Sequence, residues 1–327
     1  MIKKIRTKIE SKRGSKNIIW KLLVSAKDFL WIIQYYLLYL KEVCRIFFVR
    51  RKLFRGISYD YNLVLPPLVS RDKFARIFSD FKGKNLGFVR IPGNIGDNLI
   101  EDSTKQLLKE FNVRLKKINK KPRLEILNKR LCSRVDEFVL SGGGYMGDGF
   151  PSAARIVKSV LEYGKPVTIL PQTFSISRDN TPYKRIWVRE KESLKFREDA
   201  LLVPDLALGY EYKGKLPKVK YKSGIWLRGN DFDTESLGIE IPGSLGDPVL
   251  ICSNTRQYIQ LAALYETIIT DRLHFAIAGL IARRKVILLT TNYFKNRAVY
   301  EAWLKDLGCE WGEFNSISST SSINYGS

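Results

Sequence analysis

The chain alternates short apolar β-type runs with helical patterns in two separate blocks, and this feature constrains its fold most strongly. The first block has candidate strands at 85–91, 136–140, 166–170 and 200–203, with helical patterns at 99–111 and 151–163. The second block has candidate strands at 224–228, 266–270 and 285–290, with helical patterns at 255–265, 273–284 and 295–307. The apolar run 249–253 fits either a strand or a helix. Such alternation predicts parallel sheets covered by helices.

The two blocks predict an α/β protein with two Rossmann-like domains. The segment 210–222 is charged and poor in large apolar residues, so we place the boundary there, with domains at 58–212 and 213–327. The end of the second domain, from about 315, is rich in Ser and Asn and is expected to be a loose tail. In such folds, ligands bind beyond the carboxyl ends of the strands.

Residues 1–57 form a third region, which we interpret as a basic amphipathic helical segment. Residues 1–56 contain 15 Lys or Arg against three acidic residues, about half of the chain's net charge of +23. The longest apolar stretch, 29–40, has 12 residues, fewer than the ~20 that span a bilayer. Its Trp and Tyr residues are types that favour the headgroup region, so we expect contact with an anionic membrane surface. The alternative is a helical hairpin packed on the catalytic body.

Two glycine-containing turns follow candidate strands of the first block. Gly93, Asn94, Gly96 and Asp97 lie between a strand and a helix, where backbone N–H groups bind anions. A tight turn with a helix cap explains the same residues. Gly142, Gly143 and Gly144 follow the next strand, with Asp148 close behind. This loop indicates backbone passing a ligand or a neighbouring strand, and Asp148 suits either sugar hydroxyls or a helix cap.

Charged residues mark three further positions. Arg189, Glu190 and Ser193 form a stretch that fits either a binding site or a solvated surface. Arg228 ends a candidate strand, where a clamp for phosphate or carboxylate would lie. Arg272, Leu273 and His274 occupy a strand-to-helix turn. Arg grips anions with two hydrogen bonds, and His transfers protons near neutral pH, so this pair suits a reaction in which an anion is held and protonated.

Metal chemistry is not expected. His274 is the only histidine, and the four cysteines have no paired spacing or histidine partner, so the sequence predicts no zinc site.

Five motifs in order resemble the polysaccharide pyruvyltransferase family: PGNIGDN (92–98), VLSGGGYMGD (139–148), WVREKES (187–193), VPDLAL (203–208) and TDRLHFAIAGL (270–280). The resemblance covers about residues 84–310. It implies two Rossmann-type domains arranged as in GT-B-like glycosyltransferases, with the site in the cleft. It also implies that phosphoenolpyruvate is the donor substrate and that pyruvate is attached to a sugar as a ketal, with no cofactor.

The family's Arg-Leu-His motif falls on Arg272, Leu273 and His274, and its Arg-Glu-x-x-Ser motif falls on Arg189, Glu190 and Ser193. We therefore expect His274, Arg272 and Arg189 to be catalytic, and the other motif residues to bind substrate. Arg228 departs from the family pattern, because Gly229 and Asn230 follow it instead of Lys and Asp. The implied partner is a glycan or lipid-linked oligosaccharide, and the implied location is the cytoplasmic face of the cell membrane.

Two rival functions remain at the level of sequence. One is a nucleotide-sugar-dependent glycosyltransferase with the same two-domain plan. The other is a non-catalytic protein that binds membranes or nucleic acid through its basic arm. Since the arm has no recognisable DNA or RNA motif, we expect no nucleic-acid partner.

Deletion of residues 1–56 should release the protein from vesicles that contain anionic lipid, because that segment carries the concentrated positive charge. Co-sedimentation of the full chain and of the shortened chain with such vesicles tests this. If the deletion leaves co-sedimentation unchanged, the membrane interpretation is wrong.

Overall fold

The computed structural model of the chain describes residues 37, 44, 46–91, 93–119, 127–147, 150–176, 180–228 and 244–313. Two compact units divide the chain, Met1–Gly56 and Ile57–Ser327. In the first unit, residues 46–53 are helical, and Phe47 and Phe48 are exposed. No helix in the described ranges is both long and apolar enough to cross a membrane. Most of the predicted amphipathic segment lies outside the described residues, so its membrane contact stays a prediction.

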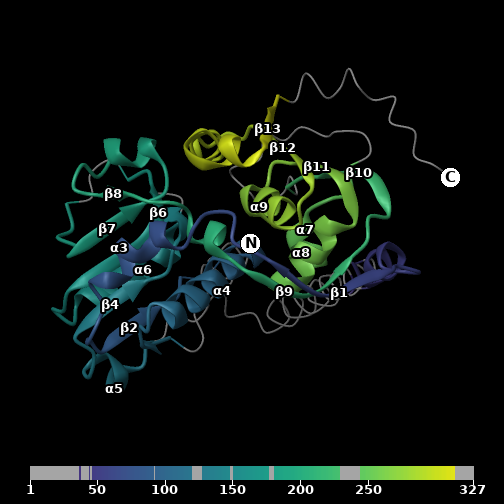
Figure 1. Cartoon of the computed structure of the whole chain (residues 1–327). Helices are drawn as coiled ribbons and strands as arrows, with labels where there is room; N and C mark the ends of the chain where they lie inside the picture. The colour runs from purple at the N-terminus through teal and green to yellow at the C-terminus, as the bar shows by residue number, and fades with distance from the viewer. Residues whose placement is uncertain are drawn as a thin grey trace, which may run out of the picture. The chain divides into compact units, whose positions relative to one another are not determined.

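The second unit contains a parallel sheet with the order β3-β2-β4-β6-β7-β8, and β5 pairs with β6 (Figure 1). Its strands are β2 (Leu86–Val89), β3 (Leu115–Lys117), β4 (Glu137–Leu140), β5 (Gly143–Met146), β6 (Val167–Phe174), β7 (Arg185–Val188) and β8 (Leu201–Leu202). Every residue of β2, β4 and β6 is buried, as expected for parallel strands covered on both faces. The strand order reverses at β2, which lies between β3 and β4. Such a reversal creates a crevice at the carboxyl ends of the strands.

The helices of this half are α3 (Asp72–Ser79), α4 (Ile95–Glu110), α5 (Lys129–Cys132) and α6 (Pro151–Leu161). Helix α4 begins where the Asn94 side chain accepts the Gly96 N–H at 2.7 Å and Asp97 accepts the Asn94 N–H at 2.8 Å. This reciprocal cap fixes the start of the helix directly after β2. Pro151 begins α6, where its missing N–H costs nothing.

A second parallel sheet, β10-β11-β12-β13, follows in sequence order. Its strands are β10 (Tyr221–Trp226), β11 (Tyr265–Thr270), β12 (Lys285–Leu289) and β13 (Cys309–Gly312). The accompanying helices are α7 (Pro248–Ile251), α8 (Thr255–Ala263), α9 (Leu273–Ile281) and α10 (Lys295–Val299), which continues through η4 (Tyr300–Leu304) and η5 (Lys305–Leu307). Helix α9 comes so close to this sheet that a Cβ on Gly279 would lie 2.7 Å from Val286 and 2.8 Å from Ile268.

Several contacts join the two sheets within the second unit. Helix α4 packs against α8 and α9. Thr255, the first residue of α8, donates a 2.7 Å hydrogen bond to Asp102 on α4. The antiparallel pair β1 (Tyr59–Leu65) and β9 (Tyr212–Pro217) links the start of the unit to the connection between the sheets. The start of α4 therefore faces the start of α9.

The predicted mixed α/β fold with parallel sheets is confirmed, and the first three residues of the ambiguous run 249–253 belong to helix α7. Strands β1, β3, β5, β7, β9 and β13 and helices α3 and α5 had no counterpart among the predicted elements. The predicted boundary between residues 212 and 213 falls at the start of β9, and the division into two domains stays a prediction.

Candidate active site

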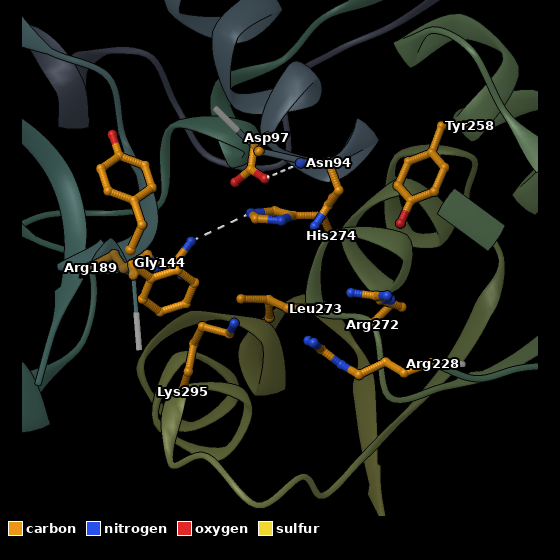
Figure 2. A pocket seen from close by; sticks show the side chains of 13 residues that line it. Asn94, Asp97, Gly144, Arg189, Arg228, Tyr258, Arg272, Leu273, His274 and Lys295 are labelled. Atoms are coloured by element: carbon orange, nitrogen blue, oxygen red, sulfur yellow. Dashed lines mark hydrogen bonds between the residues drawn. The ribbon is translucent and has the colours of Figure 1, made fainter. Parts of the chain in front are cut away.

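A cavity of about 170 Å³ opens at the carboxyl ends of both sheets. Its residues come from the segments that follow β2, β5, β7, β10 and β11, from β5 itself, and from helices α4, α8, α9 and α10. The lining residues are Gly93, Asn94, Asp97, Gly144, Tyr145, Phe150, Arg189, Arg228, Tyr258, Arg272, Leu273, His274 and Lys295. Figure 2 shows Arg189 and Lys295 on one side of the cavity and Arg228 and Arg272 on the other, with His274 projecting between α4 and α9.

Arg189 follows β7 and is completely buried. Its Nη1 lies 2.5 Å from Asp205 Oδ2, and its Nε donates to Thr173 Oγ1 at 3.0 Å. Its backbone oxygen accepts the Trp303 indole N–H at 2.7 Å. Burial by itself lowers the pKa of Arg189, but the charges of Asp205 and Glu190 outweigh it and raise the pKa, so the guanidinium stays ionised.

The remaining guanidinium nitrogen of Arg189, Nη2, is buried and has no hydrogen-bond partner within the described ranges. It lies against Gly144, where a Cβ would be only 2.8 Å away. An unsatisfied buried donor in a cavity wall indicates a position for an acceptor, and a guanidinium favours carboxylate or phosphate.

Lys295, at the start of α10, approaches the same glycine from the other direction. Its Cδ lies 3.2 Å and its Nζ 3.5 Å from the position that a Cβ on Gly144 would take. The ammonium group also lies 5.4 Å from the centre of the Tyr293 ring. The bare backbone at Gly144 thus leaves room between two cationic groups.

The opposite wall carries Arg228 and Arg272. Asp247 accepts Arg272 Nε at 3.1 Å and also contacts its Nη2, which fixes the plane of that guanidinium. Asp271 accepts the Arg228 backbone N–H at 2.9 Å. Burial raises the pKa of Asp271 to about 6, although Arg228 opposes the shift. The hydroxyl-bearing ring of Tyr258 completes this wall (Figure 2).

His274 is the second residue of α9 and is only slightly exposed. Its Nε2 lies 3.4 Å from Arg189 Nη1 and 3.5 Å from Asp205 Oδ2. On the other side of His274, a Cβ on Gly96 would be 2.7 Å from the His274 Cβ, so α4 packs directly against the histidine. The cavity therefore combines several cations with one group able to transfer a proton.

Nine of the predicted site residues line this cavity: Gly93, Asn94, Asp97, Gly144, Arg189, Arg228, Arg272, Leu273 and His274. Three predicted residues do not line it: Gly96 lies in the first turn of α4, Gly143 begins β5, and Gly142 immediately precedes that strand. Asp148 lies outside the described residues.

Glu190 and Ser193, predicted to bind substrate, are fully buried and do not line the cavity. Glu190 accepts the Thr173 hydroxyl at 3.1 Å and also the Ser193 hydroxyl. Ser193 Oγ accepts the Phe174 N–H at 2.7 Å. Glu190 and its partner Thr173 both lie next to Arg189 Nε, outside the cavity lining. Their burial also excludes the alternative that this charged stretch is a solvated surface.

Four lining residues were missed from the sequence: Tyr145, Phe150, Tyr258 and Lys295. Tyr145 belongs to the glycine-loop motif, and its position after a buried strand could have identified it. Lys295 begins the helix after β12, and the same strand-end rule would have singled it out. Tyr258 lies on α8, away from any strand end, and no sequence signal marks it. Among the described residues, no group of three or more His, Cys, Asp or Glu side chains is arranged to hold a metal ion.

Comparison with known proteins gives one matching family model and a solved structure of similar fold. A model of the polysaccharide pyruvyl transferase family matches residues 94–293, a range that includes most of the cavity residues. No curated protein matches the chain. The crystal structure of a functionally uncharacterized protein from Klebsiella pneumoniae is similar in fold, with a TM-score of 0.55 and 20% sequence identity. This similarity covers 75% of the present chain and 98% of that protein.

Glu190 should make stability depend on pH. Burial raises its pKa from 4.5 to about 7, although Arg189, Ser193 and Thr173 oppose the shift. Between about pH 4.5 and 7 the folded protein then holds a proton that the unfolded chain has lost. The stabilisation that Glu190 contributes to the folded protein is fully present below about pH 4.5. It is lost as pH rises to about 7, and this lowers the free energy of unfolding by up to about 3 kcal/mol.

The glutamine in Glu190→Gln cannot titrate. The free energy of unfolding of the wild type should therefore fall relative to that of the variant as pH rises. Denaturant unfolding of both proteins at several values between pH 5 and 7.5 measures this difference. Parallel stability curves would contradict the assignment.

Proposed function

Because the chain belongs to the polysaccharide pyruvyl transferase family, we propose that it moves the pyruvyl group of phosphoenolpyruvate onto a sugar as a ketal. The acceptor is a surface polysaccharide or a lipid-linked glycan. The observation that carries this proposal is the small cavity in which cations on two walls flank a single histidine. A GT-B-like arrangement of two Rossmann-like halves, with the cavity between them, belongs to the same proposal.

The charges of the cavity suit this donor. Phosphoenolpyruvate has a carboxylate and a phosphate, and both need cationic partners when they leave water. Arg189 Nη2 and the Lys295 ammonium group would hold one of these anions above Gly144, while Arg272 and Arg228 would hold the other. The fixed guanidinium groups need little rearrangement when charge develops during the reaction.

Cavity size supports a small donor. Pockets for drug-sized ligands are ~300–1,000 Å³, and this cavity is about 170 Å³. A nucleotide sugar needs the larger space, so phosphoenolpyruvate is the better match.

The chemistry begins with proton transfer. The imidazolium of His274 donates its proton to the methylene carbon C3, which forms a C–H bond and leaves C2 cationic. A sugar hydroxyl adds to C2 and returns its proton to His274. Phosphate then leaves with cleavage of its bond to C2, and a second hydroxyl closes the ketal while its proton passes to phosphate. The net products are the ketal and inorganic phosphate, and no oxidant or reductant is needed.

The N-terminal region suggests where the reaction takes place. We place the enzyme at the cytoplasmic face of the membrane, where lipid-linked glycans are available. The concentration of basic residues in 1–56 supports attraction to anionic lipid.

Calorimetric titration tests the choice of donor. Phosphoenolpyruvate should bind to the wild type, and a panel of nucleotide sugars should not. Arg189→Met should lose most of this binding, because it removes the buried cation but keeps a long apolar side chain. Tight binding of a nucleotide sugar in place of phosphoenolpyruvate would favour the glycosyltransferase alternative.

His274→Ala should lower turnover by ~10²–10⁴-fold, the range expected when a general acid is removed. Phosphate release from phosphoenolpyruvate, together with the mass gain of a carboxyethylidene group on the glycan, measures the reaction. Binding of phosphoenolpyruvate to the variant controls for an intact cavity. Near-normal turnover would remove His274 from the scheme.

A further inference from the structure

Asp205 is a buried carboxylate that does not line the cavity but contacts two residues that do. It lies immediately before the short helix η3 (Leu206–Gly209) and is only 1% exposed. Its Oδ1 accepts the Ala207 backbone N–H at 2.8 Å, which fixes the orientation of the carboxylate. Its other oxygen, Oδ2, is left to face Arg189 and His274.

The geometry around Oδ2 joins a permanent cation to a titratable ring. Arg189 Nη1 lies 2.5 Å from Oδ2, and His274 Nε2 lies 3.5 Å from it. The same Nη1 and Nε2 are 3.4 Å apart, and this contact is a hydrogen bond only when the ring is neutral and Nε2 accepts, because a guanidinium can only donate. A protonated imidazole beside a buried guanidinium is repelled by it, and the closest carboxylate that offsets this repulsion is Asp205.

We propose that Asp205 is a positioning residue that orients the His274 ring through Nε2 and holds Arg189 with Nη2 toward the cavity. Its role in catalysis rests on the proposed function, in which His274 acts as the acid. The contacts that define it do not depend on the identity of the substrate.

The ionisation of Asp205 agrees with this role. Burial by itself would raise the pKa of Asp205, but the charge of Arg189 and the interaction with His274 hold it well below its usual range. The carboxylate is therefore ionised throughout the neutral range. Because the attraction is mutual, loss of this charge favours the neutral form of the ring.

Other charged groups surround the histidine, so a test must separate their effects. Glu190 lies 3.6 Å from Arg189 Nε and is as deeply buried as Asp205, but its hydroxyl partners are Thr173 and Ser193. The remaining charged groups around the cavity are Asp97 from α4, Lys295 from α10, Arg272 immediately before α9, and Arg228 after β10 (Figure 2). Glu190→Gln is consequently the matched control, because it replaces a buried carboxyl group that is next to Arg189 but not next to His274.

His274 is the only histidine in the chain, so its ring can be followed without assignment in untagged protein labelled with ¹³C,¹⁵N-histidine. In Asp205→Asn, the midpoint of the ring's NMR titration should fall by about one pH unit or more, the effect expected on removing an opposite charge at this distance. Glu190→Gln should leave the midpoint close to the wild-type value. An unchanged midpoint in Asp205→Asn, or an equal fall in both variants, would overturn the proposal.

A measurement on the wild type covers the case in which Asp205→Asn does not fold. Above the titration midpoint, the neutral ring should carry its proton on Nε2, donated toward Asp205, and ¹⁵N chemical shifts report this tautomer. A neutral ring protonated mainly on Nδ1, with Nε2 accepting from Arg189, would contradict the pairing.

Kinetics then separates this inference from the proposed function. If phosphoenolpyruvate is the donor, Asp205→Asn should lower kcat more than it raises KM, and the loss of kcat at high pH should begin at lower pH than in the wild type. If the NMR titration shifts but no turnover of phosphoenolpyruvate is found, the proposed function is wrong and the pairing of Asp205 with His274 is supported. The pairing fails alone if turnover is found and neither the NMR titration nor the kcat profile moves.

Discussion

The rest of the site depends on the interactions that stabilise the completely buried guanidinium of Arg189. A buried charge without partners costs several kcal/mol, and breaking a buried ion pair costs ~3–5 kcal/mol. This cost is offset by contacts with Asp205, Thr173 and Glu190, which lie around Arg189 on the sides away from the cavity. One nitrogen, Nη2, is left for a ligand. This incomplete satisfaction distinguishes a binding site from a structural ion pair, in which each donor has a partner.

The fold brings the partners of Arg189 together from distant parts of the chain. Arg189 follows β7 in the first sheet, His274 follows β11 in the second, and Trp303 reaches back from η4 to the Arg189 carbonyl oxygen. The close contacts of Gly96 with His274 and of Gly279 with the second sheet set the height of α9 at this junction. A larger side chain at either glycine would displace the helix that carries the histidine. The chemistry thus depends on packing between the halves of the second unit as much as on the motif residues.

The sequence predicted the parallel α/β fold and most of the cavity, because both follow from the same local pattern. Gly93, Arg228 and Arg272 follow strands directly, and parallel strands bring such positions to one edge of a sheet. Composition was a poor guide where contacts between residues distant in sequence determine whether a charged side chain is buried. The charged stretch at Arg189 resembles a solvated surface until its partners are known, because Asp205 is 16 residues away and Trp303 is 114 residues away in sequence. Tyr258 could not be assigned for the same reason, and Asp205 lies in the VPDLAL motif, but its contacts with Arg189 and His274 are evident only in the structure.

The carboxylates behind the cavity explain how so many cations can lie close together before any substrate binds. Asp205 holds Arg189, Asp247 holds Arg272, and Asp271 accepts the backbone N–H of Arg228. Each carboxylate lowers the repulsion between neighbouring cations, and the pairs with Arg189 and Arg272 also fix the planes of those guanidinium groups. An anion that enters the cavity therefore meets donors that are already oriented, and little of its binding energy is spent on ordering side chains. In a site of this kind, the carboxylates behind the cavity determine how its cationic side chains are oriented.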